Sequence, residues 1–168
     1  GGLLNSREKL DIARQLDILG VDVIEAGFPI NSAAELEAVR LIAQEVRRPV
    51  ICALSHANAE AVDQAWEAIK SGARPRIHIF LSASDIHLLH QLKKSREEIL
   101  ETSRSMVARA KSHCRDVEFS PMDASRTDRS YIFKVIEATI DAGATTINLP
   151  DTVGYAVPQE WGDFIASV

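Results

Sequence analysis

The sequence contains only two cysteines, Cys52 and Cys114, in 168 residues. Two cysteines without CxxC spacing make neither a disulfide framework nor a metal knuckle, so we expect each to be a small buried hydrophobe in a reducing compartment. No apolar run approaches the roughly 20 residues that cross a bilayer. Residues 1–5 have neither the basic region nor the apolar stretch of a signal peptide. These absences predict a soluble, cytoplasmic protein without a membrane partner.

Basic charge is also scarce, because 24 acidic residues stand against 19 basic ones and the formal net charge is -5. The charges are spread along the chain, so no basic stripe is offered to a phosphate backbone, and a nucleic-acid partner is not expected. A hydrophobic content of 46% with 26% charged residues is ordinary for a globular domain with a real core. Disordered and collagen-like classes are therefore excluded.

Short apolar runs alternate with amphipathic helical patterns along the whole chain. Strands joined by helical crossovers are parallel, so the pattern predicts an α/β fold. The sequence has no GxGxxG after the first strand, and polar residues recur at strand ends, which favours a partial TIM (β/α)8 barrel over a doubly wound sheet. Strands are expected at 21–26, 49–54, 76–81, 116–119 and 144–149. Helices are expected from Ser6 to Gly20, from Ser32 to Val46, over 59–69, from Ser95 to Ser112, over 131–142, and from Pro158 onward.

Residues 82–94 form the one long connection, and it follows a strand, where a barrel carries its functional loops. This segment contains Asp85, His87 and His90. The two histidines have no third ligand nearby in the sequence, so we expect them in a loop over a pocket rather than in a metal site.

One face of the predicted sheet is unexpectedly polar. Residues two apart in a strand share a face, which groups Arg76 with His78, Glu118 with Ser120, and Thr146 with Asn148. Glu25 falls on the corresponding face of the first strand. Buried charges need partners or water, so this face is either a structural network, in which Arg76 pairs with Glu118, or the lining of an active site.

Several separated segments each lie at the end of a predicted strand. They are VIEAGFP at 23–29, RPRIHIF at 74–80, SDIH at 84–87, DVEFSP at 116–121 and AGATTINLPDTVGY at 142–155. Together and in this order, these segments resemble the 2-isopropylmalate synthase family. Homocitrate and citramalate synthases share the barrel and are close alternatives.

The resemblance implies that acetyl-CoA condenses with 2-oxoisovalerate to give 2-isopropylmalate, the committed step of leucine synthesis. It also implies a divalent metal (Mg, Mn or Zn) that chelates the 2-oxo acid, and a homodimer when full length. Glu25 and His78 are implied as catalytic residues, with Glu25 in the polar network around the metal. Leu54 corresponds to a pocket wall that shapes side-chain specificity, and Thr152 to the residue that meets the substrate carboxylate. The residues implied to line the 2-oxo acid pocket are His78, Ser120, Asn148, Pro150 and Thr152.

The chain departs from the family pattern in two ways. The first-strand motif with a metal-binding aspartate and an arginine is missing, and so is the His-x-His pair of the seventh strand. We therefore expect residues 1–168 to be an incomplete catalytic barrel domain that lacks strands one, seven and eight and every metal ligand. Met122 stands where most relatives have a glutamate, so an acid–base role there is vacant or filled by Asp123 or a water. The chain alone is expected to be inactive, and the alternative is a non-catalytic 2-oxo-acid-binding or interaction protein.

Overall fold

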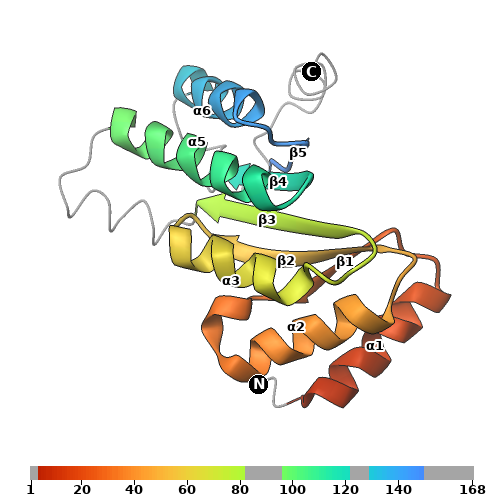
Figure 1. The fold of residues 1–168 in the computed structure, drawn as a ribbon. Coiled ribbons are helices and arrows are strands. Elements are labelled where there is room, and N and C mark those ends of the chain that lie inside the picture. The colour runs from red at the N-terminus through yellow and green to blue at the C-terminus, as the bar shows by residue number, and fades with distance from the viewer. Residues whose placement is uncertain (1–3, 82–95, 122–128, 150–168) are drawn as a thin grey trace.

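A computed structural model describes residues 4–81, 96–121 and 129–149, and Figure 1 shows their arrangement. Five parallel strands form one sheet in the order β1-β2-β3-β4-β5, which is also their order in the chain. Sequential order without reversal is what a barrel requires, and it confirms the predicted topology. The strands are β1 (Val23–Gly27), β2 (Val50–His56), β3 (Pro75–Leu81), β4 (Asp116–Pro121) and β5 (Thr146–Ile147).

The strand boundaries differ from the predicted ones by one or two residues at both ends. β2 continues to His56 and β4 to Pro121, two residues beyond the predicted ends, because both strands stay paired with β3 to that point. β5 is shorter than predicted, since only Thr146 and Ile147 pair with β4.

The helices follow the predicted pattern with small shifts at their starts. They are α1 (Ser6–Ile18), α2 (Ala33–Glu45), α3 (Ala59–Ile69), α5 (Arg96–His113) and α6 (Arg129–Asp141), with a short 3-10 turn η1 (Pro29–Asn31) after β1. Ser32 caps α2 by accepting from the Glu35 amide. α1 is capped by Asn5, whose side chain accepts from the Glu8 amide, so Ser6 is its first residue. The loop at 82–94, the cap at Ser95 and the helix from Pro158 lie outside the described residues.

The core lies between the sheet and the helices, which pack along one of its faces (Figure 1). Alternate strand residues such as Ile51, Ile77, Val117 and Phe119 are fully buried there. Cys52 and Cys114 are buried free thiols, as predicted. Within the described ranges no helix packs on the opposite face, so the helices cover only the outside of a curved sheet.

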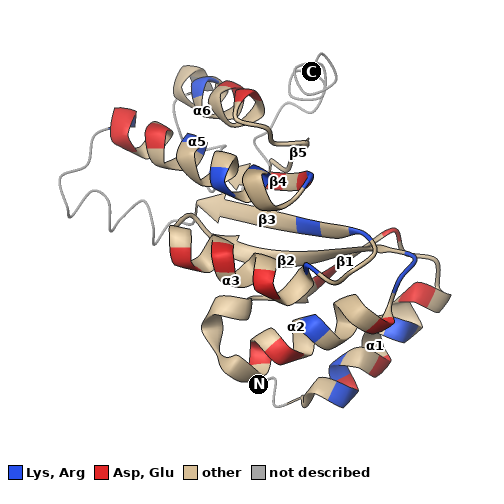
Figure 2. Ribbon diagram, in the orientation of Figure 1, with Lys and Arg blue, Asp and Glu red and all other residues tan. Residues whose placement is uncertain are grey.

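Figure 2 shows that acidic and basic residues are interspersed along the helices. α1 also exposes apolar side chains near the first strand, since Ile18 and Leu19 are each 77% exposed. Among the residues that the structure describes, no helix combines the length and the apolar character of a membrane span.

Candidate active site

The face of the sheet opposite the helices carries three successive rows of side chains. The parallel register sets these rows, because paired residues in neighbouring strands point to the same side. Glu25 in β1 is paired with Cys52 at one end of the first row. From the N-terminal to the C-terminal ends of the strands, the rows are Cys52, Arg76 and Asp116, then Leu54, His78, Glu118 and Thr146, and then His56, Phe80 and Ser120.

Arg76 is the cation of this face. Its Nε donates to Asp116 Oδ2 at 2.9 Å and its Nη1 donates to Glu118 Oε1 at 3.3 Å. Burial acts to lower the pKa of Arg76, but the hydrogen bond and charge of Asp116 and the charge of Glu118 raise it overall. The predicted pairing of Arg76 with Glu118 is therefore present, and Asp116 is a second partner that the sequence argument missed.

His78 lies at the centre of the polar face and is 5% exposed. Its Nε2 is 2.6 Å from Ser120 Oγ and 3.6 Å from Glu118 Oε2. Its Nδ1 is 3.3 Å from Glu25 Oε1, although this contact is not a hydrogen bond. Three of the residues predicted for the site, Glu25, His78 and Ser120, therefore meet around one imidazole ring.

The other predicted pocket residues are less closely placed. Leu54 is half-buried and lies beside His78 in the sheet register. Asn148 is exposed just after β5, and its backbone amide donates to the Phe119 carbonyl at 3.0 Å. Pro150 and Thr152 lie outside the described residues.

Aromatic rings gather at the C-terminal ends of β1 to β3. Phe28 stacks on His56 with ring centroids 5.3 Å apart, and Phe80 meets each of these rings edge-on at the same separation. The sequence argument gave no site role to Phe28, and it missed His56 because the second strand was predicted to end at Leu54. Extending the two-residue period of that strand by one step would have placed His56 on this face.

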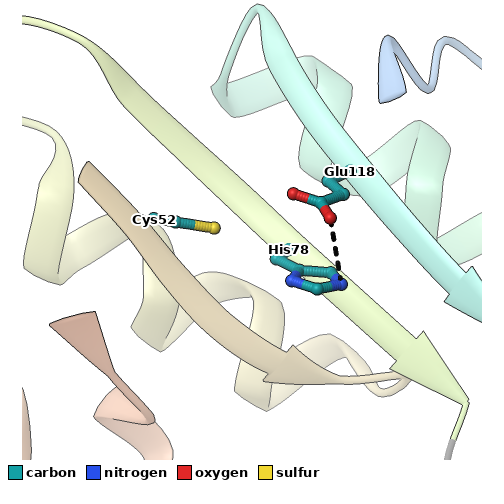
Figure 3. A group of neighbouring side chains, drawn as sticks. All are labelled: Cys52, His78 and Glu118. Atoms are coloured by element: carbon teal, nitrogen blue, oxygen red, sulfur yellow. Dashed lines mark ion pairs between the residues drawn. The ribbon is translucent and has the colours of Figure 1, made fainter. Parts of the chain in front are cut away.

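Cys52, His78 and Glu118 are the one group of described side chains that brings three possible metal-ligand atoms together (Figure 3). Their ligand atoms lie within 4.8 Å of one another. As they stand they do not fit a metal, because the Arg76 cation already pairs with Glu118 and would repel a metal ion. Burial, and then the charges of Glu118 and Glu25, raise the pKa of the Cys52 thiol far above its ordinary range. A protonated thiol is a poor ligand, so no chemical step is assigned to a metal at these residues.

Chemically, the face offers a hydroxyl, an imidazole and a half-exposed carboxylate within a few ångström, with apolar rings and Leu54 beside them. Such a set can bind the oxygens of a small carbonyl compound while an aliphatic group packs against the rings and Leu54. The residues present suit hydrogen bonding and proton handling.

Comparison with known proteins gives a consistent result. A family model described as HMGL-like matches residues 2–168. Curated relatives include 2-isopropylmalate synthase of Syntrophus aciditrophicus, which is 57% identical over 166 residues, covering 99% of this chain and 32% of the relative. 2-Isopropylmalate synthase B of Solanum pennellii is 51% identical over 177 residues, covering 100% and 29%. The chain thus spans about a third of the length of these relatives.

A solved structure resembles the fold. The crystal structure of HMG-CoA lyase from Bacillus subtilis matches with a TM-score of 0.67 and 21% sequence identity, covering 98% of this chain and 57% of that one. At this identity the likeness concerns the fold alone.

Proposed function

Because this chain belongs to the HMGL-like family, we propose that residues 1–168 form strands two to six of the catalytic (β/α)8 barrel of a 2-isopropylmalate synthase. The complete enzyme would condense acetyl-CoA with 2-oxoisovalerate and release 2-isopropylmalate and CoA. The observation that carries the proposal is the identity of 51–57% over nearly the whole chain to relatives named 2-isopropylmalate synthase. Homocitrate and citramalate synthases remain alternatives that the substrate test below separates.

We assign the 2-oxo acid pocket to the C-terminal part of the inner sheet face. Leu54 and the adjacent rings suit the branched aliphatic group of the substrate, while Ser120 and His78 suit its oxygens. Asn148, Pro150 and Thr152 follow β5 and complete the same end of the barrel in this proposal. The list of proposed pocket residues is therefore Leu54, His78, Ser120, Asn148, Pro150 and Thr152.

Glu25 and His78 are the proposed catalytic residues. The condensation needs a proton removed from the acetyl methyl group and a hydrogen-bond donor for the alkoxide that develops on the ketone oxygen. Glu25 has a half-exposed carboxylate that can accept a proton, and it lies 3.3 Å from Nδ1 of His78. The buried His78 ring holds the Ser120 hydroxyl, 2.6 Å from its Nε2, in place before substrate arrives, which lowers the reorganisation that the reaction requires.

A divalent metal (Mg, Mn or Zn), a homodimeric assembly and a cytoplasmic location are further parts of the proposal, all taken from the family resemblance. The metal ligands would come from outside this chain, since Cys52, His78 and Glu118 do not fit a metal as they stand. A location other than the cytoplasm occurs among the relatives, because one of them is 2-isopropylmalate synthase 2, chloroplastic, of Arabidopsis thaliana.

The test is release of CoA thiol by the complete enzyme with a panel of 2-oxo acids. We expect the highest kcat/KM with 2-oxoisovalerate, and 2-isopropylmalate as the product identified by mass spectrometry. A preference for pyruvate would indicate a citramalate synthase, and one for 2-oxoglutarate a homocitrate synthase. Binding of 2-oxoisovalerate without thiol release would support the non-catalytic alternative and overturn the proposal.

A further inference from the structure

The contacts of His78 point to a role for a residue not yet assigned to the site. We infer that Glu118, held by Arg76, is a positioning residue that keeps the His78 proton on Nε2, so that Ser120 can donate its hydroxyl proton to the substrate. The inference rests on the proposed function for its substrate. The part of the inference that places the His78 proton on Nε2 concerns only the substrate-free protein, so it can be tested without turnover.

Glu118 is fixed in place by Arg76, which is itself held by a further carboxylate. Its side chain is 8% exposed, and Arg76, which is 16% exposed, donates to its Oε1 at 3.3 Å. Arg76 is itself fixed by Asp116 at 2.9 Å, and the Thr145 hydroxyl donates to the other oxygen of Asp116 at 2.7 Å. A carboxylate held by a cation in this way cannot turn away from the imidazole, so its negative charge acts on His78 Nε2 at a constant distance of 3.6 Å.

The two ring nitrogens of His78 therefore have different surroundings. Nε2 has two oxygens in front of it, those of Ser120 and Glu118, whereas Nδ1 has no hydrogen-bond partner among the described residues. A buried N–H without a partner is costly, and a lone pair facing a fixed carboxylate is repelled by it. Both effects favour a proton on Nε2 and a lone pair on Nδ1.

Other groups facing the ring do not reverse this preference. Glu25 lies 3.3 Å from Nδ1, but its side chain is 47% exposed, so water screens its charge and it can rotate away. The Cys52 thiol stays neutral because of its burial. Phe80 meets the ring edge-on with centroids 6.1 Å apart and provides no charge.

The tautomer decides what Ser120 can do. A serine hydroxyl has one proton to donate and two lone pairs that accept. When Nε2 carries the proton, Ser120 Oγ accepts it across 2.6 Å, and the hydroxyl proton remains available for a substrate oxygen. When Nε2 carries a lone pair, Ser120 donates to it and has no proton left for the substrate. Glu118 would thus act on the substrate through His78 and Ser120 without touching it.

The first measurement is nitrogen-15 NMR of labelled histidine in the complete, substrate-free enzyme, with the His78 signals assigned by comparison with His78→Asn. We expect Nε2 of the wild-type protein to be protonated and Nδ1 to be an acceptor. In Glu118→Gln the amide can donate to Nε2, so the proton should move to Nδ1. Glu101→Gln also removes one negative charge, but on the exposed side of α5 and away from the site. This control should leave both signals unchanged.

The second measurement is kcat/KM for the 2-oxo acid. Glu118→Gln and Ser120→Ala should each lower it about ten- to a hundred-fold, and the double variant should lose little more than either alone, because both changes remove the same donated proton. Independent losses that multiply in the double variant would refute the link between the two residues.

A wild-type His78 protonated on Nδ1 with a lone pair on Nε2 would overturn the inference even if Glu118→Gln failed to fold. A wild-type Nε2–H that Glu118→Gln leaves unchanged would remove Glu118 from the mechanism. Absence of thiol release by the wild-type enzyme would refute the proposed function instead, and the NMR result would still stand or fall separately.

Discussion

Replacement of Gly27 by alanine should strongly destabilise the protein, because both backbone and space at this position require glycine. Gly27 ends β1 with φ +143°, a conformation that side chains rarely adopt. A Cβ there would lie 2.4 Å from Glu35 Oε1 and 3.3 Å from Val39 Cγ2. Glu35 Oε1 also accepts from the Phe28 amide at 3.1 Å, and Glu35 Oε2 accepts from Lys9 Nζ at 3.2 Å. The substitution therefore strains the chain and also displaces the carboxylate that fixes the turn after β1.

The expected loss combines these two terms. Strain at a disfavoured φ costs roughly 1–3 kcal/mol, and a lost hydrogen bond to a charged group roughly 1.5–3 kcal/mol. We expect urea unfolding to show a decrease of about 2.5–6 kcal/mol in the free energy of unfolding. The matched control is Gly20→Ala, which has φ +89° but nothing within 4 Å of the new Cβ, so only about 1–2 kcal/mol of strain should be lost.

A double variant identifies the cause of the Gly27 effect. In a Glu35→Ala background the carboxylate is already gone, so Gly27→Ala should cost only about as much as Gly20→Ala. Equal losses for Gly27→Ala and Gly20→Ala in the wild-type background would refute the role assigned to Glu35.

Three further predictions concern other parts of the molecule. Arg109 and His113 of α5 bind Asp63 of α3 at 2.6 Å and 3.1 Å, and their hydrogen bonds lower the pKa of Asp63 from 3.8 to about 2. A carboxyl group whose pKa is lowered by folding stabilises the folded state at pH values above its ordinary pKa. The small difference in melting temperature between wild type and Asp63→Asn should therefore be constant above pH 4 and vanish as the pH falls toward 2. Burial raises the pKa of both cysteine thiols, so Cys52 and Cys114 should react with a thiol reagent only after unfolding, and fast reaction in the native state would contradict their burial. The 168-residue chain alone should show no metal-dependent thiol release from acetyl-CoA with 2-oxoisovalerate, and release above a no-enzyme control would show that its own residues bind the metal.

The sequence allowed the order of strands and helices to be predicted because each element carries its own period. Alternate apolar residues such as Ile77 and Ile79 identify one buried face without knowledge of any neighbour. The pairing of Arg76 with Glu118 also followed from spacing and charge. Contacts that depend on register between strands were harder to predict, since no single strand specifies it. Register sets two such contacts: Asp116 as the second partner of Arg76, and the pairing of Cys52 with Glu25 across β1 and β2.

Strand ends were the other source of error. His56 lies beyond the predicted end of its strand, so its ring was not counted on the inner face, and the group that it forms with Phe28 and Phe80 was missed. Where a strand ends depends on how far its neighbours continue to pair with it. The role of Glu118 could not be read from the sequence for a related reason, because it depends on which nitrogen of His78 faces which oxygen.

The central claim is that the inner face of this sheet forms the 2-oxo acid pocket of a synthase, and steady-state kinetics of two variants of the complete enzyme test it most directly. Thr152→Ala should lower kcat/KM for 2-oxoisovalerate about ten- to a hundred-fold and change the KM for acetyl-CoA much less, since a lost hydrogen bond to a carboxylate costs roughly 1.5–3 kcal/mol. His78→Ala should lower kcat as well, with a melting curve to show that the folded fraction is unchanged. If both variants keep the full kcat/KM for 2-oxoisovalerate, the pocket is not where we propose it.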